Sequence, residues 1–292
     1  MMKIIIDSTT DLPGELIEKY HIDVIPLRVL IGDEEFTDKE TITVEEVYEY
    51  MKKGICPKTS LQSPQRIYDL FSRYASQGMD FIYYSFSSKL SGTYQAAFQI
   101  IEDLKREFPK VRMAIIDTLS GSIAAGLIAL QGAKMAETGT SFEKIIRVSM
   151  DCIRHIEHVF TIDDLNWLLK GGRISKKSAV IGSALNIKPI LDVKDGEMNV
   201  IKKIRGRKKA LEAVVDIVEE RIRSFPNQII GIAHADDFET ALKIKDMLIK
   251  KLGHNRNIII EKIGSVLGSH LGIGGVGVFF FNRQPECYID EL

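Results

Sequence analysis

The sequence has few of the residues that cross-link or ligate in small proteins. It contains three cysteines, one tryptophan and six histidines among 292 residues. Cys56, Cys152 and Cys287 are odd in number and far apart. This pattern argues against a disulfide framework or a zinc-finger spacing, and it favours a reducing compartment. We therefore expect a cytoplasmic protein.

An excess of charge of one sign and long apolar runs are also missing. The 39 basic and 40 acidic residues give a formal charge of −1, so no overall field attracts nucleic acid or an anionic membrane. One stretch without a charged side chain, residues 118–133, is rich in Gly, Ser and Ala. It is shorter than the ~20 apolar residues of a membrane span and predicts a buried helix. At the N-terminus an aspartate follows three isoleucines, which predicts a strand and no signal peptide. We expect neither nucleic-acid binding nor stable membrane insertion.

What is present suffices for a substantial core, because 45% of the residues are hydrophobic and 27% are charged. The length leaves room for about two domains of ordinary size. In the first half, short β-rich runs alternate with helical patterns, which predicts a parallel α/β sheet with helices on both faces. The expected strands cover residues 3–7, 22–31, 81–86 and 111–117.

The second half has a different pattern from about residue 158. Two β-rich runs flank Asp195-Gly196, a pair that favours a tight hairpin, so antiparallel pairing enters a mixed sheet. We predict an α/β protein with two domains: a three-layer parallel unit over residues 1–158 and a mixed-sheet unit over residues 159–292. No Pro- or Ser-rich linker separates the two units, so they are expected to be closely apposed.

Three motif-like features carry little chemistry on their own. The glycines of residues 272–277 match a dinucleotide fingerprint, but a strand-like run follows where a helix is needed, which favours close backbone packing. His155 and His158 have no partners at ligand spacing, so we interpret them as surface or capping residues and expect no metal site. Six of the eight residues 202–209 are basic. Cations are unfavourable at a helix start, so either a solvated helix start or an anionic partner explains this cluster.

Two hydroxyl-rich turns are the strongest chemical feature. Ser91 and Thr93, within SSKLSGTYQAA, stand at a predicted helix start, where free backbone N–H groups favour an anion. Thr59 and Ser60, within PKTSLQSP, precede another helix one unit earlier. Successive turns of a parallel sheet emerge on the same edge, so both turns are predicted to face one ligand head group. Ordinary helix capping is the alternative explanation.

Seven segments, taken in order along nearly the whole chain, resemble the DegV family of bacterial fatty-acid-binding proteins. Each is short, but the ordered set is specific. The segments are DSTTDLP, KTSLQSP, SSKLSGTYQAA, IIDTLSGS, LLKGGRIS, NIKPIL and IGSVLGSHLGIGGVGVFF. The resemblance implies that residues 1–158 carry the head-group turns and that residues 159–292 close a lipid pocket.

The resemblance also implies a function. Such a protein buries one long-chain fatty acid such as palmitate, stearate or oleate, without a cofactor and without catalysing a reaction alone. Thr59 and Ser91 then hydrogen-bond the carboxylate, with His270 near it. A separate ATP-dependent fatty acid kinase converts the presented acid to acyl phosphate for lipid metabolism. Arg173 and Arg205 are the candidates for docking this partner or stabilising the transferred phosphoryl group.

The chain departs from the family pattern in places. Residues 59–63 read Thr-Ser-Leu-Gln-Ser where Thr-Ser-Gln-Pro-Ser is frequent, and Ser265 and Ile273 replace common prolines. These changes concern the shape of the pocket more than its head-group chemistry. Two other functions stay open. One is a stand-alone phosphotransferase or hydrolase acting through Ser91 and His270, and the other is a nucleic-acid or protein-interaction module using residues 202–209.

Overall fold

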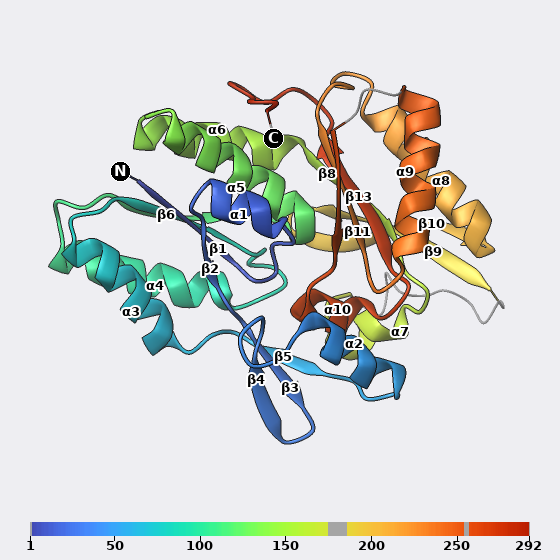
Figure 1. The fold of residues 1–292 in the computed structure, drawn as a ribbon, viewed down its shortest axis with the longest axis horizontal. Helices are drawn as coiled ribbons and strands as arrows, with labels where there is room; N and C mark the ends of the chain where they lie inside the picture. Colours follow the sequence, from blue (N-terminus) through green and yellow to red (C-terminus); the bar gives the residue numbers. More distant parts are fainter. Residues whose placement is uncertain (1, 175–185, 254–256, 292) are drawn as a thin grey trace.

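The computed structural model describes residues 2–174, 186–253 and 257–291. Within these ranges the first sheet has four parallel strands in the order β2-β1-β6-β7 (Figure 1). Alternate residues of β1 point to opposite faces, so Ile5 joins a cluster with α3 and α4, whereas Ile4 and Ile6 face α1, α5 and α6. The strands are β1 (Lys3–Asp7), β2 (Asp23–Ile25), β6 (Phe81–Ser85) and β7 (Met113–Asp117), and the helices are α1 (Gly14–Lys19), α3 (Pro64–Ser76), α4 (Thr93–Glu107), α5 (Ser122–Glu137) and α6 (Phe142–His155).

The second sheet has six strands in the order β10-β9-β8-β13-β11-β12 and is mixed, because only β11 and β12 run parallel. Helices α8 and α9 lie side by side on its outer face (Figure 1). The predicted hairpin is confirmed, with Asp195 and Gly196 at φ 52° and 83° in its turn. The elements are β8 (Ile156–Thr161), β9 (Ile187–Lys194), β10 (Glu197–Arg205), α8 (Arg207–Arg221), β11 (Ile229–His234), α9 (Phe238–Leu252), β12 (Asn257–Lys262) and β13 (Val276–Phe281).

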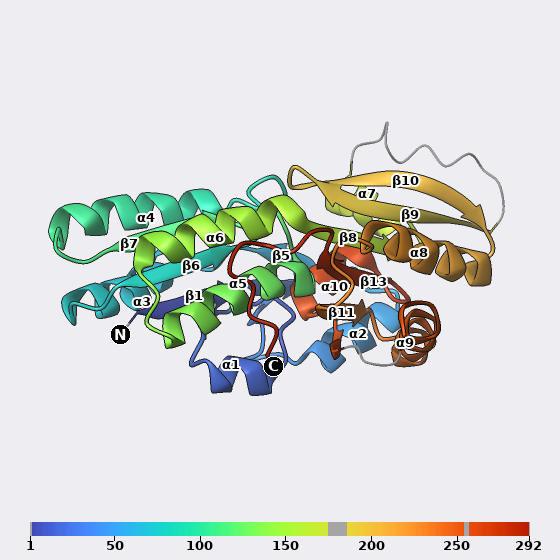
Figure 2. The same cartoon turned by 90° about the horizontal axis from the view of Figure 1, so that it is seen from above.

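A small antiparallel sheet, β4-β3-β5, was not predicted. Helix α10 packs against β3 and β5 and also against α2 and α7 (Figure 2). The expected strand over residues 22–31 is wrong, because Pro26 has no N–H for a ladder and separates β2 from β3, which pair in different sheets. The elements are β3 (Arg28–Ile31), β4 (Glu34–Thr37), α2 (Val44–Lys52), β5 (Lys58–Ser60), α7 (Asn166–Gly171) and α10 (Ser265–Leu271).

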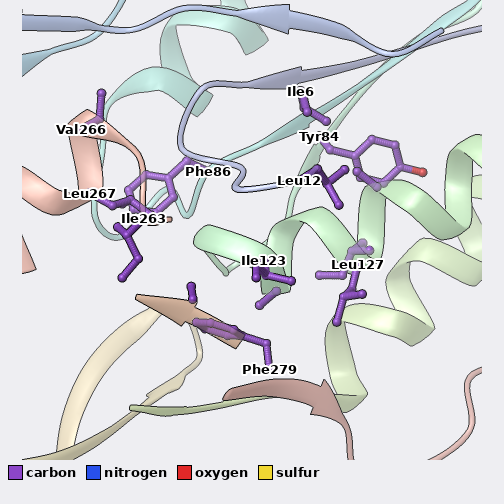
Figure 3. Packing of buried hydrophobic residues seen from close by; sticks show 14 of the residues in the cluster. Ile6, Leu12, Tyr84, Phe86, Ile123, Leu127, Ile263, Val266, Leu267 and Phe279 are labelled. Atoms are coloured by element: carbon purple, nitrogen blue, oxygen red, sulfur yellow. The ribbon is translucent and has the colours of Figure 1, made fainter. Parts of the chain in front are cut away.

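Helix α5 lies between the two large sheets. Fourteen of its 16 residues are buried, as a helix that is apolar on every side requires. Figure 3 shows Ile123 and Leu127 between Leu12 and Tyr84 on one side and Phe279 of β13 on the other. One apolar cluster therefore runs from the parallel sheet into the mixed sheet.

The predicted fold class is confirmed: a parallel α/β sheet is followed by an α/β unit with a mixed sheet. The division predicted between residues 158 and 159 falls within β8. Among the residues described here, no helix has the length and apolarity needed to cross a bilayer.

Candidate ligand-binding site

A polar cavity of about 300 Å³ opens where the small sheet, α10 and the start of α4 meet. Four of the five predicted site residues line it: Thr59, Ser91, Arg173 and His270. The fifth, Arg205, is not among its lining residues. The structure therefore brings together hydroxyl groups, an imidazole and a guanidinium from segments far apart in the sequence.

Thr59 comes from β5 and is fixed by pairing with Val29 of β3. Its Oγ1 lies 2.8 Å from Nε2 of His270, within hydrogen-bond distance. The predicted geometry of this turn is wrong, since Thr59 belongs to the antiparallel small sheet and not to a turn of the parallel sheet. It still shares the cavity with Ser91, because Leu61, two residues further on, packs beside Gly92.

The loop before α4 carries Ser91 and is held at several points. The backbone N–H of Phe86 donates to Asp7 at 2.9 Å, and the N–H of Ser88 donates to Asp117 at 3.1 Å. The Ser87 hydroxyl donates to the carbonyl of Gly196 at 2.8 Å, which ties the loop to the tip of the β9–β10 hairpin (Figure 2). Ser91 is therefore presented by a loop whose position depends on both halves of the chain.

Ser91 stands directly before the N-terminus of α4, as predicted. Its Oγ accepts from the backbone N–H of Thr93 at 3.3 Å and lies 2.9 Å from the Thr93 hydroxyl. The first N–H groups of a helix lack intrahelical acceptors and favour negative charge. Hydroxyl donors and a helix terminus thus point to one side of the cavity.

Helix α10 carries His270 and is anchored before its first turn. The N–H of Gly264 donates to Asp11 at 2.9 Å, and the Tyr48 hydroxyl donates to the carbonyl of Ile263 at 3.0 Å. The α7 backbone approaches so closely that a Cβ on Gly171 would overlap the His270 ring. Burial, helped by the nearby Arg173 charge, lowers the pKa of His270 to about 4. The imidazole is therefore neutral at physiological pH.

Arg173 follows α7, whose C-cap residue Gly172 adopts the left-handed conformation with φ 70°. Its Nε donates to the carbonyl of Leu90 at 3.2 Å and its Nη1 to the carbonyl of Gly171 at 2.6 Å. Within the described ranges no carboxylate pairs with Arg173. Partial burial lowers the pKa of the guanidinium, which stays charged because its ordinary pKa is so high. A cation without an acidic partner thus borders the cavity.

The basic cluster of residues 202–209 lies elsewhere. Arg205 is exposed at the end of β10, opposite Ile187 in the register. Arg207 forms ion pairs with Asp163 and Asp237, which neutralise one cation at the start of α8. The cluster is therefore separate from the polar cavity.

An apolar cavity continues from the polar one between the mixed sheet and α10. Five residues line both spaces: Phe86, Leu90, Met198, Leu267 and Leu271. Figure 3 shows Phe86, Leu267 and Ile263 gathered on the side of this region opposite Phe279. The glycine-rich segment contributes Gly275 and Gly277 to its wall. A Cβ on Gly277 would come 2.9 Å from the Cβ of Phe160, so this glycine permits close strand packing. Gly277 lies within β13, the strand predicted at the end of the glycine-rich segment.

Ser60 was predicted to lie in the first hydroxyl-rich turn but was not among the predicted carboxylate donors. Its Oγ is buried and has no hydrogen-bond partner among the described residues, and the residue lines the polar cavity. Its position beside Thr59 was the available signal. The enzyme alternative lacks its central contact, since Nε2 of His270 lies against Thr59 and the hydroxyl of Ser91 lies against Thr93.

A parallel sheet and a mixed sheet packed around one central helix define a known class of α/β proteins. The family model described as "Uncharacterised protein, DegV family" matches residues 1–283. A DegV domain-containing protein of Clostridium perfringens is 36% identical over 283 residues, covering 96% of this chain and 97% of the relative. The chain belongs to the DegV family.

Solved structures agree with this assignment. A stearic acid-binding protein from Eubacterium ventriosum matches with a TM-score of 0.89 and 26% identity, over 96% of this chain and 97% of that one. DegV from Bacillus subtilis, described as a fatty acid binding protein, matches with a TM-score of 0.84 and 29% identity, over 96% and 99% of the two chains.

Proposed function

We propose that this protein binds one long-chain fatty acid and presents its carboxylate to a separate ATP-dependent kinase. The observation that carries the proposal is the junction of a polar cavity with an apolar one; the polar cavity contains hydroxyl donors and a guanidinium that has no carboxylate partner among the described residues. An amphiphile with an anionic head matches the polarity of this pair of spaces, and the apolar one, about 40 Å³ in this structure, must widen to take a long tail. The solved relatives described as binding stearic acid or fatty acids support the same ligand class.

The acyl tail supplies the affinity. Burying a chain of ~16 carbons contributes about 0.8 kcal/mol per methylene, or roughly 12 kcal/mol before the costs of association and ordering. Palmitate, stearate and oleate are the expected ligands. No cofactor is needed for this role.

The head group fixes the position of the ligand along the pocket. A carboxylate removed from water needs donors, and the hydroxyls of Thr59 and Ser91 are proposed to provide them. Neutral His270 donates directly or orients Thr59 through their shared contact. The Arg173 charge favours the ionised acid, so we now place this residue with the head group as well as with phosphoryl transfer. In this proposal residues 1–158 supply both hydroxyls, and residues 159–292 close the lipid pocket.

The protein is proposed to be a carrier and not an enzyme by itself. The kinase would transfer the γ-phosphoryl group of ATP to the exposed end of the bound acid and give acyl phosphate for lipid metabolism. Exposed Arg205 is the candidate contact for that partner. A cytoplasmic location, where ATP is available, fits this role.

Native mass spectrometry of the purified protein, followed by solvent extraction, tests the binding step. One fatty acid per chain is expected. An empty protein that also fails to take up added stearate would overturn the proposal.

Incubation with ATP tests the carrier step separately. Acyl phosphate should appear only when a fatty acid kinase is added. Turnover by the purified chain alone would revive the enzyme alternative.

A further inference from the structure

His158 lies inside the molecule, although the sequence suggested a surface or capping role. Only 3% of its surface is exposed, and neither ring nitrogen has a hydrogen-bond partner among the described residues. Its ring meets Phe279 edge to face at a centroid distance of 5.7 Å. An unpaired buried polar group costs free energy, so its position needs a reason.

The register of β8 turns this side chain toward the apolar cavity. Side chains alternate along a strand, and Val159 packs in the outer cluster under α8. His158 and Phe160 therefore point the other way, and both line the apolar cavity. The imidazole is a polar group set into a mostly apolar wall, in which the hydroxyl of Ser122 already donates to Asp11.

His158 lies at the end of the apolar cavity that is farther from the polar cavity. The apolar cavity shares its near-end residues with the polar cavity, but His158 is not one of them. Instead, His158 and Val193 also line a third, polar depression on the far side. A ligand whose carboxylate reaches Thr59 and Ser91 would thus bring a remote part of its tail to His158.

The chemistry of the ring selects one kind of tail substituent. Burial lowers the pKa of His158 to about 3, so the imidazole is neutral and offers one N–H donor and one nitrogen acceptor. A hydroxyl group also donates and accepts. A carboxylate or ammonium at this depth would remain an uncompensated charge.

We propose that His158 recognises a hydroxyl group on the acyl chain, so that the protein takes hydroxylated long-chain fatty acids in preference to their unsubstituted parents. This inference rests on the proposed fatty-acid function and refines its substrate class. One hydroxyl group reaches only one ring nitrogen, so it would satisfy either the N–H or the acceptor nitrogen of the imidazole, inside a cavity whose lining is mostly apolar and where a hydrogen bond is stronger than in solution.

Competition binding at pH 7 with stearate, 10-hydroxystearate and 12-hydroxystearate tests the proposal. The wild-type protein should bind at least one hydroxy acid roughly 10-fold more tightly than stearate, as expected for satisfying a buried polar group. In His158→Phe this preference should vanish or reverse while stearate binding is retained. His155→Phe is the matched control, because His155 contacts Asn282 and lies outside the cavity lining, and it should keep the preference.

The outcomes separate the two proposals. If no acid binds, the fatty-acid function itself fails. If stearate binds and neither hydroxy acid is preferred, or if His158→Phe leaves the preference intact, the role of His158 is overturned. Should His158→Phe fold poorly, the ¹⁵N shifts of the wild-type imidazole provide the readout: they should change with a hydroxy acid and not with stearate.

Discussion

Thr59 and His270, 211 positions apart in the chain, meet at 2.8 Å between Oγ1 and Nε2. The contact joins the small sheet to α10, so the proposed head-group site exists only when both halves of the sequence are folded together. Removing the hydroxyl group of Thr59 or Ser91 should weaken fatty-acid binding more than it lowers the free energy of unfolding.

Thr59→Val and Ser91→Ala test the donors. Each keeps most of the side-chain volume and removes one hydrogen bond to a charged group, worth about 1.5–3 kcal/mol. We expect stearate affinity to fall roughly 10- to 100-fold for each, as measured by titration calorimetry. Ser76→Ala, at an exposed position of α3, should leave affinity unchanged. Wild-type affinity in the Thr59 and Ser91 variants would remove the head-group assignment.

Arg173 and Arg205 should behave differently. Arg173→Gln removes the cation beside the polar cavity, so stearate binding should weaken several-fold. Arg205→Gln alters an exposed residue outside the lining and should leave binding unchanged, while phosphorylation by an added kinase falls. Equal effects of the two substitutions on binding would contradict this division of roles.

Gly171→Ala tests the packing behind His270. The added Cβ would overlap the imidazole, so His270 must move away from Thr59, and both stearate affinity and melting temperature should drop. Gly14→Ala adds the same atom at the start of α1, where nothing lies within 4 Å, and should change neither. A Gly171→Ala protein that binds like wild type would show that the ring position is unimportant.

The buried His158 predicts a pH dependence of stability. Its pKa is about 3 in the folded protein and about 6.5 when unfolded. Between these values the unfolded state binds the extra proton, so acidification destabilises the fold by up to about 1.4 kcal/mol per pH unit. Relative to His158→Phe, the wild-type free energy of unfolding should fall from pH 6.5 towards pH 4. The prediction is contradicted if the free energies of unfolding of the wild type and of His158→Phe, measured with urea at pH 7, 6 and 5, change in parallel. Burial raises the pKa of Asp11 to about 7. This residue titrates in both proteins, so its contribution cancels in the difference between their free energies of unfolding.

Periodicity and turn chemistry were enough to predict most of the two large sheets. The Asp195-Gly196 pair predicted the hairpin, and the β-rich run predicted over residues 3–7 is strand β1. The small sheet was missed because its strands are three or four residues long, too short for a period to show. The small sheet is what brings Thr59 close to Ser91. The sequence predicted this proximity only because both residues were wrongly assigned to turns at one edge of the parallel sheet.

Thr59 and Ser91 were singled out by their hydroxyl-rich turns, whereas His270 and Arg173 were predicted by family resemblance alone. Nothing in the local sequence joins His270 to Thr59, since their contact depends on how α10 docks on β5. His158 was misjudged for a related reason. His158 lies in a strand that is buried on both faces. Its neighbours Val159 and Phe160 are both apolar, so the sequence shows no alternation of polar and apolar residues from which the direction of the His158 side chain could be predicted.

Helix α5 has a consequence for how the molecule melts. Because both large sheets bury the same helix, neither half can lose its structure without exposing apolar surface that the other half covers. The boundary predicted between residues 158 and 159, which falls within β8, is therefore not expected to separate two units that unfold independently. Calorimetry should record a single heat-absorption peak whose calorimetric and van't Hoff enthalpies agree, and residues 1–158 expressed alone should not give a folded unit.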